Sequence, residues 1–169
     1  MAVQVIERLA PQVGTVMINA NRHLDAWRDL GLPVFVDVFE GFAGPLAGLH
    51  AALGRADTPW VATAPCDAPF LPDDLVARLA RGATARGARI AIARTADRLH
   101  PVFALVDRSL RDALQRDLES GQRRVHAWMA EHGAVEVDFD DAAAFRNLNT
   151  ADDLARWAPA DARLSRPES

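Results

Sequence analysis

Short apolar segments alternate with segments of helical periodicity along almost the whole chain. The apolar segments have the length of β-strands and cover residues 13–18, 32–37, 60–64, 88–94, 100–107 and 134–139. The helical segments cover residues 2–10, 24–30, 72–86, 109–121 and 122–132, and two more begin at Pro45 and after Thr150. Strands that alternate with helices form α/β folds, because the helices pack on the faces of the sheet. We therefore predict an α/β fold with a mostly parallel sheet and helices on both faces.

The composition indicates one globular domain and argues against several classes of protein. A chain of 169 residues can bury one core, which we assign to residues 1–157, with a flexible tail at 158–169. The formal net charge of −4 gives no support to nucleic-acid binding. No apolar run is long enough for a membrane span, no signal-peptide pattern is visible, and the single Cys66 cannot form an internal disulfide. These features predict a cytoplasmic protein.

An acidic residue stands between two prolines in the segment VATAPCDAPFLPDDL, residues 61–75. The apolar run before it is typical of a buried strand, which Pro65 ends, and Pro69 prevents a quick return to regular structure. A helical pattern with acids in its first turn then begins near Pro72. Asp67 therefore lies at the carboxyl end of a strand, which is the edge where open α/β sheets bind ligands.

Polar side chains also mark the ends of the first two expected strands. Asn19 and Asn21 follow the first strand, and Asp37 ends the second. Because the carboxyl ends of adjacent parallel strands face one crevice, we expect these side chains to converge with Asp67. Carboxylate and amide oxygens suit Mg²⁺, and the glycines of GFAGPLAG, residues 41–48, let the backbone approach a ligand closely. These residues predict an acidic Mg²⁺ site.

Each of these residues also has a structural interpretation that the sequence leaves open. Aspartate at a strand end is common in turns, and asparagine fits left-handed turns. Cys66 is interpreted as a small packed residue, because the sequence shows no zinc motif and no nucleophile–base pair. His100, the first residue of the expected strand 100–107, is interpreted as a loop histidine before Pro101, and we expect His50, His126 and His132 on helix surfaces without a role.

Six sequence segments occur in an order that is more specific than any one of them. They are VMINANRH, GLPVFVDVFEGFAGPLAG, PCDAPFLPDDL, HPVFALV, SGQRRV and FRNLNTADDLARW. Together they resemble the molybdenum cofactor guanylyltransferases, a branch of the nucleotidyltransferases, over residues 3–157. The resemblance implies a Rossmann-like fold of the nucleotidyltransferase type. It also implies transfer of GMP from GTP to molybdopterin, with release of pyrophosphate.

The resemblance implies roles for individual residues as well. Asn19 and Asp37 would contact the guanine nucleotide, and Asp67 would bind both the nucleotide and Mg²⁺ as the catalytic residue. Two amides and two arginines would lie toward the pterin: Asn147, Asn149, Arg123 and Arg124. Mg²⁺ is the implied cofactor, and the implied partners are GTP as substrate, molybdopterin, and molybdoenzyme maturation proteins.

One part of the family pattern has no counterpart in this sequence. The family opens with a strand, a glycine-rich loop that wraps the triphosphate, and a lysine, whereas here all 19 basic residues are arginine. We therefore expect an N-terminally truncated domain whose first strand is missing, and which binds GTP poorly and transfers no guanylyl group. Two explanations stay open: a false internal start of the coding sequence, or a short protein that has lost nucleotide transfer.

Two other functions are compatible with the same residues. One is a different Mg²⁺-dependent nucleotidyltransferase of this fold, acting on CTP or a sugar phosphate, because the contacts that select the base are not visible in the sequence. The other is a non-catalytic paralogue that binds the pterin cofactor or a partner enzyme. A comparison of the affinities for GTP and CTP would distinguish the first alternative from guanylyl transfer. Pterin binding without GTP consumption would favour the second alternative.

Overall fold

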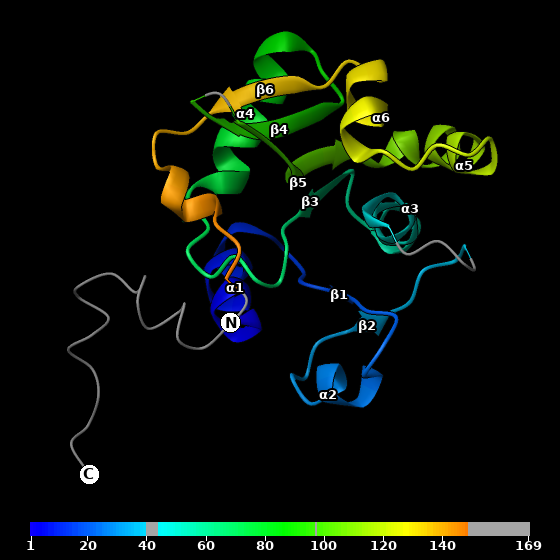
Figure 1. The fold of residues 1–169 in the computed structure, drawn as a ribbon, viewed down its shortest axis with the longest axis vertical. Coiled ribbons are helices and arrows are strands. Elements are labelled where there is room, and N and C mark those ends of the chain that lie inside the picture. The colour runs from blue at the N-terminus through cyan, green and yellow to red at the C-terminus, as the bar shows by residue number, and fades with distance from the viewer. Residues whose placement is uncertain (40–43, 97, 149–169) are drawn as a thin grey trace.

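The alternation of strands and helices in the sequence reappears in the computed structural model, which describes residues 1–39, 44–96 and 98–148 (Figure 1). The helices are α1 (Ala2–Leu9), α2 (Leu24–Arg28), α3 (Pro45–Arg55), α4 (Leu75–Arg86), α5 (Arg111–Glu119) and α6 (Val125–Glu131), with short 3₁₀ turns η1 (Ala10–Gln12), η2 (Arg108–Leu110) and η3 (Ala142–Phe145). The strands are β1 (Ile18–Asn19), β2 (Val34–Phe35), β3 (Trp60–Thr63), β4 (Ile90–Thr95), β5 (Arg98–Asp107) and β6 (Val135–Asp138). None of these helices is long and apolar enough to cross a membrane.

The main sheet has four strands in the order β3-β5-β4-β6. β6 pairs with β4 in parallel, whereas β5 is antiparallel to both β3 and β4. β5 runs in the opposite direction because only residues 96–97 separate it from β4, and a parallel crossover needs a dozen or more residues. Three of the four strands therefore share one direction, and β5 forms a hairpin with β4.

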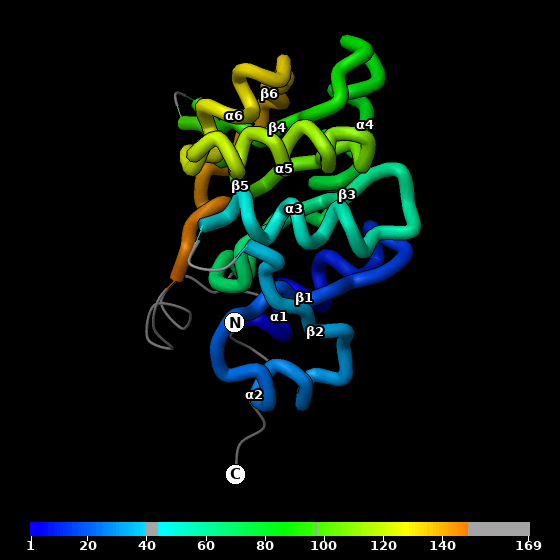
Figure 2. The backbone as a smooth tube through the Cα atoms, turned by 90° about the vertical axis from the view of Figure 1, so that its right-hand side faces the viewer, coloured from blue at the N-terminus to red at the C-terminus, as the bar shows by residue number. Residues whose placement is uncertain are grey.

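Helices cover both faces of this sheet, as predicted. On β4, Ile90 and Ile92 belong to the core that contains side chains of α3, α5 and α6, while Ala91 and Ala93 face the core with α4. This alternation follows from the period of two along a strand. Figures 1 and 2 show α3 and α5 on the side of the sheet that faces away from α4. The predicted α/β fold is confirmed.

β1 and β2 form a separate parallel pair, which lies with α2 below the main sheet in Figures 1 and 2. Helix α3 connects this pair to the main sheet, because Phe35 of β2 shares a core with Leu49 and Leu53 of α3 and Ile90 of β4. The ends of β1 and β2 are therefore held at a fixed place beside α3. That position decides where the polar residues after these strands lie.

Several predicted element boundaries need correction. The first strand was expected at 13–18 but covers only Ile18–Asn19, since its partner β2 is equally short. Helix α4 begins at Leu75 instead of residue 72. The side chain of Gln12 caps its first turn by accepting from the Val76 N–H at 2.9 Å and donating to the Pro72 carbonyl at 2.9 Å. The helix expected after Thr150 and the tail at 158–169 lie outside the described residues.

Asp117 connects α5 to α6 through two hydrogen bonds. Its Oδ2 atom accepts from Nε1 of the fully buried Trp128 at 2.8 Å and from Nε2 of His132 at 2.8 Å. The hydrogen bond from His132, and then the one from Trp128, lower the pKa of Asp117, although desolvation acts in the opposite direction. His132, expected on a helix surface without a role, thus helps to hold two helices together.

We expect Asp117→Asn to lower the free energy of unfolding by about 1 kcal/mol at pH 7, because a charged acceptor makes stronger hydrogen bonds than an amide. The folded pKa of Asp117 is depressed, so its contribution is complete above the unfolded aspartate pKa of about 3.9 and is lost as the pH falls through the lower folded value. Urea unfolding at pH 7 measures the loss of unfolding free energy, and urea unfolding at pH 3 measures how far that loss shrinks in acid. The matched control is Asp112→Asn, whose exposed side chain lies on the same helix. An equal effect of both variants would contradict this role.

Candidate functional site

Asn19 and Asp37 meet at the carboxyl ends of β1 and β2. The two strands are parallel with Asn19 opposite Phe35, which places Asp37 one residue pair beyond the ladder. The Asn19 side-chain Nδ2 donates to Oδ1 of Asp37 at 2.9 Å and, more weakly, to the Phe35 carbonyl at 3.5 Å. The predicted convergence of these two residues is therefore present in the structure, while their role toward a nucleotide remains a prediction.

Asn21 holds the same carboxylate from its other side. Its Nδ2 donates to Oδ2 of Asp37 at 2.8 Å, and its Oδ1 accepts from the Asp37 backbone N–H at 2.9 Å. Each oxygen of the Asp37 carboxylate thus receives one amide hydrogen bond. Asn21 was expected at this edge of the sheet, but no contact with the nucleotide was predicted for it. Its spacing of two residues from Asn19 was the available signal, because residues two apart on an extended chain face the same side.

Helix α3 packs closely against this pair at Gly48. A Cβ atom on Gly48 would lie 2.4 Å from Oδ1 of Asn19 and 3.6 Å from Oδ1 of Asp37. Gly44, at the start of the helix, has extended backbone and open space around it. Of the described glycines in the GFAGPLAG segment, it is therefore Gly48 that permits the close approach.

Asp67 lies in the loop after β3, as predicted. Its backbone carbonyl accepts from the Leu148 N–H at 2.8 Å, which brings the segment with the exposed Asn147 beside this loop. Its Oδ1 atom is buried and has no hydrogen-bond partner among the residues that the structure describes. No hydrogen bond or ion pair between described residues joins Asp67 to Asn19 or Asp37, so the convergence of Asp67 with this pair stays a prediction.

The environment of Asp67 fits a Mg²⁺ ion. A buried carboxylate oxygen without a partner is costly, and a bound water or metal ion is one way to satisfy it. No cluster of three or more candidate ligands occurs within the described ranges. Mg²⁺ does not need one, because it often binds one or two carboxylates and completes its shell with water and phosphate oxygens.

Cys66 precedes Asp67 and is exposed, so the expectation of a packed residue is wrong. The part of its side chain that is shielded from solvent, and then the adjacent Asp67, raise the pKa of its thiol. A raised pKa disfavours the thiolate, which is the nucleophilic form of cysteine. This chemistry agrees with a site that works without a protein nucleophile.

The arginines predicted for the pterin side lie between α5 and α6. The Arg123 guanidinium donates to the Leu118 carbonyl at 2.8 Å, which caps the end of α5. Arg124 is the residue before α6, and its exposed side chain makes no hydrogen bond or ion pair with the described part of the chain. Asn149, the fourth predicted pterin-side residue, lies outside the described residues.

Two histidines are buried, contrary to expectation. His100 lies in β5 instead of a loop, bonds to Thr95 Oγ1 at 2.7 Å and stacks on Phe145. His50 is buried within α3 beside Phe39. Burial, and then the charge of Arg111, lower the pKa of His50, which favours the neutral ring.

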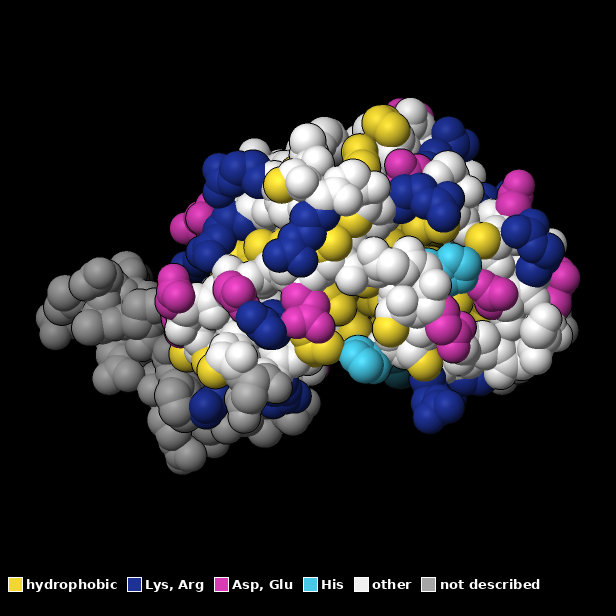
Figure 3. Space-filling view, turned by 90° about the horizontal axis from the view of Figure 1, so that it is seen from above, with side chains coloured by type: hydrophobic (Ala, Val, Ile, Leu, Met, Phe, Trp, Pro, Cys, Tyr) yellow, Lys and Arg dark blue, Asp and Glu magenta, His cyan; other side chains and the backbone are white. Residues whose placement is uncertain are grey.

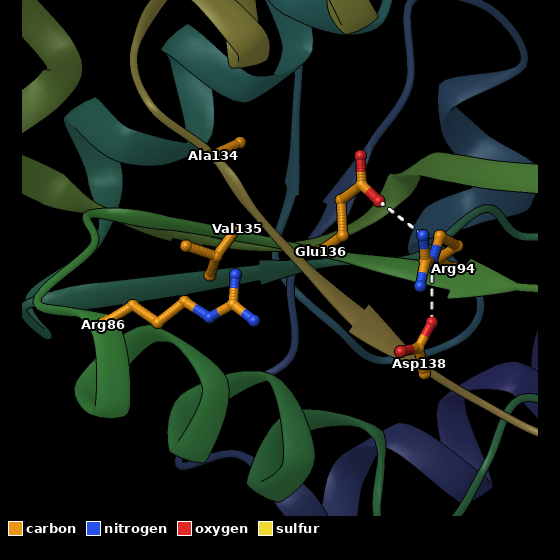
Figure 4. Close-up of a pocket in the computed structure, with 6 residues that line it drawn as sticks. All are labelled: Arg86, Arg94, Ala134, Val135, Glu136 and Asp138. Atoms are coloured by element: carbon orange, nitrogen blue, oxygen red, sulfur yellow. Dashed lines mark hydrogen bonds and ion pairs between the residues drawn. The ribbon is translucent and has the colours of Figure 1, made fainter.

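A surface cavity of about 360 Å³ lies on the edge strand β6, away from the predicted site residues (Figure 4). Arg94 bridges two acids across it, at 3.1 Å from Glu136 and 2.6 Å from Asp138. On the face of the molecule seen in Figure 3, arginines and acids are likewise interspersed, with apolar side chains between them. The charges lining the cavity largely compensate one another, so we do not assign it to the site.

Comparison with known proteins identifies relatives over almost the full sequence. A model of the MobA-like NTP transferase domain matches residues 1–136. A molybdenum cofactor guanylyltransferase from Cupriavidus taiwanensis is 52% identical over 159 residues, which cover 91% of this chain and 80% of the relative. A protein of the same name from Ralstonia nicotianae is 48% identical, covering 94% of this chain and 82% of the relative.

Solved structures agree with the fold. Molybdopterin-guanine dinucleotide biosynthesis protein A from Archaeoglobus fulgidus matches with a TM-score of 0.73 and 23% identity over 96% of this chain and 85% of that one. 2-C-methyl-D-erythritol 4-phosphate cytidylyltransferase from Thermus thermophilus matches with a TM-score of 0.66 and 18% identity over 96% of this chain and 88% of that one. At such identities these structures show the fold alone. The domain match and the relatives near 50% identity show that this chain belongs to the MobA-like NTP transferase family.

Proposed function

We propose that this protein is a molybdenum cofactor guanylyltransferase, which transfers GMP from GTP to molybdopterin and releases pyrophosphate. The observation that carries the proposal is 52% identity, over 91% of the chain, to a relative with that name. A cytidylyltransferase is also similar in fold, but only at 18% identity. Guanylyl transfer is therefore the better supported of the two nucleotidyltransferase activities.

The Asn19–Asp37 pair is suited to hold a guanine base. An ionised carboxylate only accepts hydrogen bonds, and each Asp37 oxygen keeps acceptor capacity beyond the single bond it receives from Asn19 or Asn21. The N1–H and 2-amino groups of guanine are neighbouring donors that match two carboxylate oxygens. We assign base recognition to Asp37. Asn19, which donates to the Asp37 carboxylate, would contact the nucleotide beside it.

Asp67 is the residue that would hold Mg²⁺, through the buried Oδ1 atom that lacks a partner. When bound there, Mg²⁺ would neutralise charge on the triphosphate. Asp67 itself contributes its side-chain carboxylate. Its backbone carbonyl accepts a hydrogen bond from the Leu148 N–H, which anchors the residue. The segment around Leu148 thereby keeps this loop in place beside Asn147.

The reaction needs positioning more than covalent chemistry from the protein. A terminal phosphate oxygen of molybdopterin forms a bond to the α-phosphorus of GTP, while the bond from that phosphorus to the bridging oxygen breaks and pyrophosphate leaves. The chain orients the two substrates for in-line attack, which agrees with a sequence that has acids and amides at strand ends and needs no protein nucleophile. Asn147 and Arg124 are the described side chains that we assign to the pterin end, with Asn149 beyond the described residues.

The proposed activity also suggests a compartment and partners. GTP is consumed, so we propose a cytoplasmic location. The product is a finished cofactor that must be delivered, so we propose molybdoenzyme maturation proteins as later partners. Pull-down from a cytoplasmic extract with the chain as bait, with and without molybdopterin, tests this delivery step.

Incubation of the protein with molybdopterin, GTP and Mg²⁺ tests the proposal against the expectation of weak GTP binding and no transfer, which the absence of lysine from the sequence raises. The proposed reaction forms the guanine dinucleotide of the cofactor and one pyrophosphate per transfer. Chromatography of the oxidised pterin and a pyrophosphate assay measure the two products. EDTA should stop the reaction, and CTP should not replace GTP. Transfer from CTP would favour the cytidylyl alternative, and pterin binding without any nucleotide consumption would favour a non-catalytic role.

A further inference from the structure

Helix α3 touches the proposed base site at one position. The ideal Cβ position on Gly48 lies 2.4 Å from Oδ1 and 3.1 Å from Cγ of Asn19, which is closer than any side chain can come. The same position lies 3.6 Å from Oδ1 of Asp37. With Asn19 in its present position, only glycine fits at residue 48.

The helix cannot easily move away from this contact. Its flanking residues Leu46, Ala47 and Leu49 are almost completely buried, and Leu46 and Leu49 belong to the core on one face of the main sheet. Asn19, in contrast, is exposed at the end of a two-residue strand. A methyl group on residue 48 would therefore displace the Asn19 amide and leave the helix in place.

The position of that amide matters for the carboxylate next to it. Asn19 donates to Oδ1 of Asp37 at 2.9 Å, and Asn21 donates to Oδ2 at 2.8 Å. Loss of the first bond leaves the carboxylate held from one side. The orientation of Asp37 thus depends on a glycine in a different element.

We infer that Gly48 is a positioning residue for guanine nucleotide binding, which acts through Asn19 on the Asp37 carboxylate. This inference rests on the proposed function for its effect on GTP. Its structural part concerns only the Asn19–Asp37 contact.

The test compares Gly48→Ala with Gly54→Ala in the same helix. At Gly54 the added Cβ would meet only the flexible side chain of Arg111, at 2.9 Å from Nε. Both changes raise helix propensity equally, so we expect both proteins to melt within a few degrees of wild type. Calorimetry with GTP and Mg²⁺ should show affinity about 10- to 100-fold weaker for Gly48→Ala and unchanged for Gly54→Ala.

Two further measurements separate this inference from the proposed function. In the Asn19→Ala background, Gly48→Ala should cause no additional loss of GTP affinity, because its target is already absent. Without nucleotide, NMR should show that the side-chain NH₂ signals of Asn19 shift in Gly48→Ala and stay in place in Gly54→Ala. Unshifted signals, or an equal further loss in the double variant, would overturn the inference. Shifted signals in a protein whose wild type binds no GTP would support the positioning role and refute the proposed function.

Discussion

Replacing Asp67 with asparagine is expected to lower the rate of guanylyl transfer by at least about 100-fold, because the substitution removes the carboxylate that we assign to Mg²⁺. The fold should not suffer. The Oδ1 atom of Asp67 makes no hydrogen bond to the described residues, and asparagine keeps the size and shape of the side chain, so the fold loses no contact. The melting temperature without Mg²⁺ should therefore be unchanged.

Asp74→Asn is the matched control for this experiment. Asp74 lies on the same segment, is exposed, and makes no capping hydrogen bond to α4. Mg²⁺ with GTP should raise the melting temperature of wild type and of Asp74→Asn but not of Asp67→Asn, because a ligand stabilises only the protein that binds it. Equal stabilisation of all three proteins would show that Asp67 is a turn residue and that the metal position lies elsewhere.

The main outline of the fold is predictable because each element carries its own periodicity. Leu75 and Leu79 of α4 repeat at helical spacing and are fully buried on one face of the sheet. The alternation of Ile90 to Ala93 on β4 divides those side chains between two cores. Local sequence is sufficient to predict such elements, since the spacing of their apolar residues along the chain matches the pattern of burial.

Elements whose extent depends on a partner were predicted less well. The apolar run at 13–18 suggested a full strand, but a strand is defined by its ladder, and β1 pairs only with the two residues of β2. The start of α4 depends on Gln12, which lies more than 60 residues earlier in the chain. His50 lies in helix α3, which is buried on nearly all sides. A prediction that assumes one buried and one exposed helix face therefore places His50 wrongly on the surface.

The site residues, too, divide into those that local sequence predicts and those that depend on distant partners. Asn19 and Asp37 were predicted to converge, because residues at the ends of neighbouring parallel strands must lie at one edge. The packing of Gly48 on Asn19 and the contact of Leu148 with Asp67 join elements that no local pattern connects. Sequence therefore indicated the acids and amides, while the residues that hold them in place required the fold.

Asp37→Asn is expected to weaken GTP binding by about 100-fold and to remove the preference for guanine. Asn19 and Asn21 each donate to a different oxygen of the Asp37 carboxylate. An amide offers only one oxygen, so one of the two donors would face an NH₂ group, and the base would lose one of its two acceptors. Calorimetry with GTP and with ITP, which lacks the 2-amino group, measures the loss directly.

The ratio of the two affinities distinguishes recognition of the base from a general loss of structure. Wild type should bind GTP at least about tenfold more tightly than ITP, which corresponds to one charged hydrogen bond, and Asp37→Asn should bind the two alike. Asp25→Asn is the control, since its ion pair with Arg28 on α2 lies on the solvent-exposed surface. If Asp37→Asn weakens GTP and ITP by the same factor and keeps the preference, the carboxylate supports the loop, and another group reads the 2-amino edge of guanine.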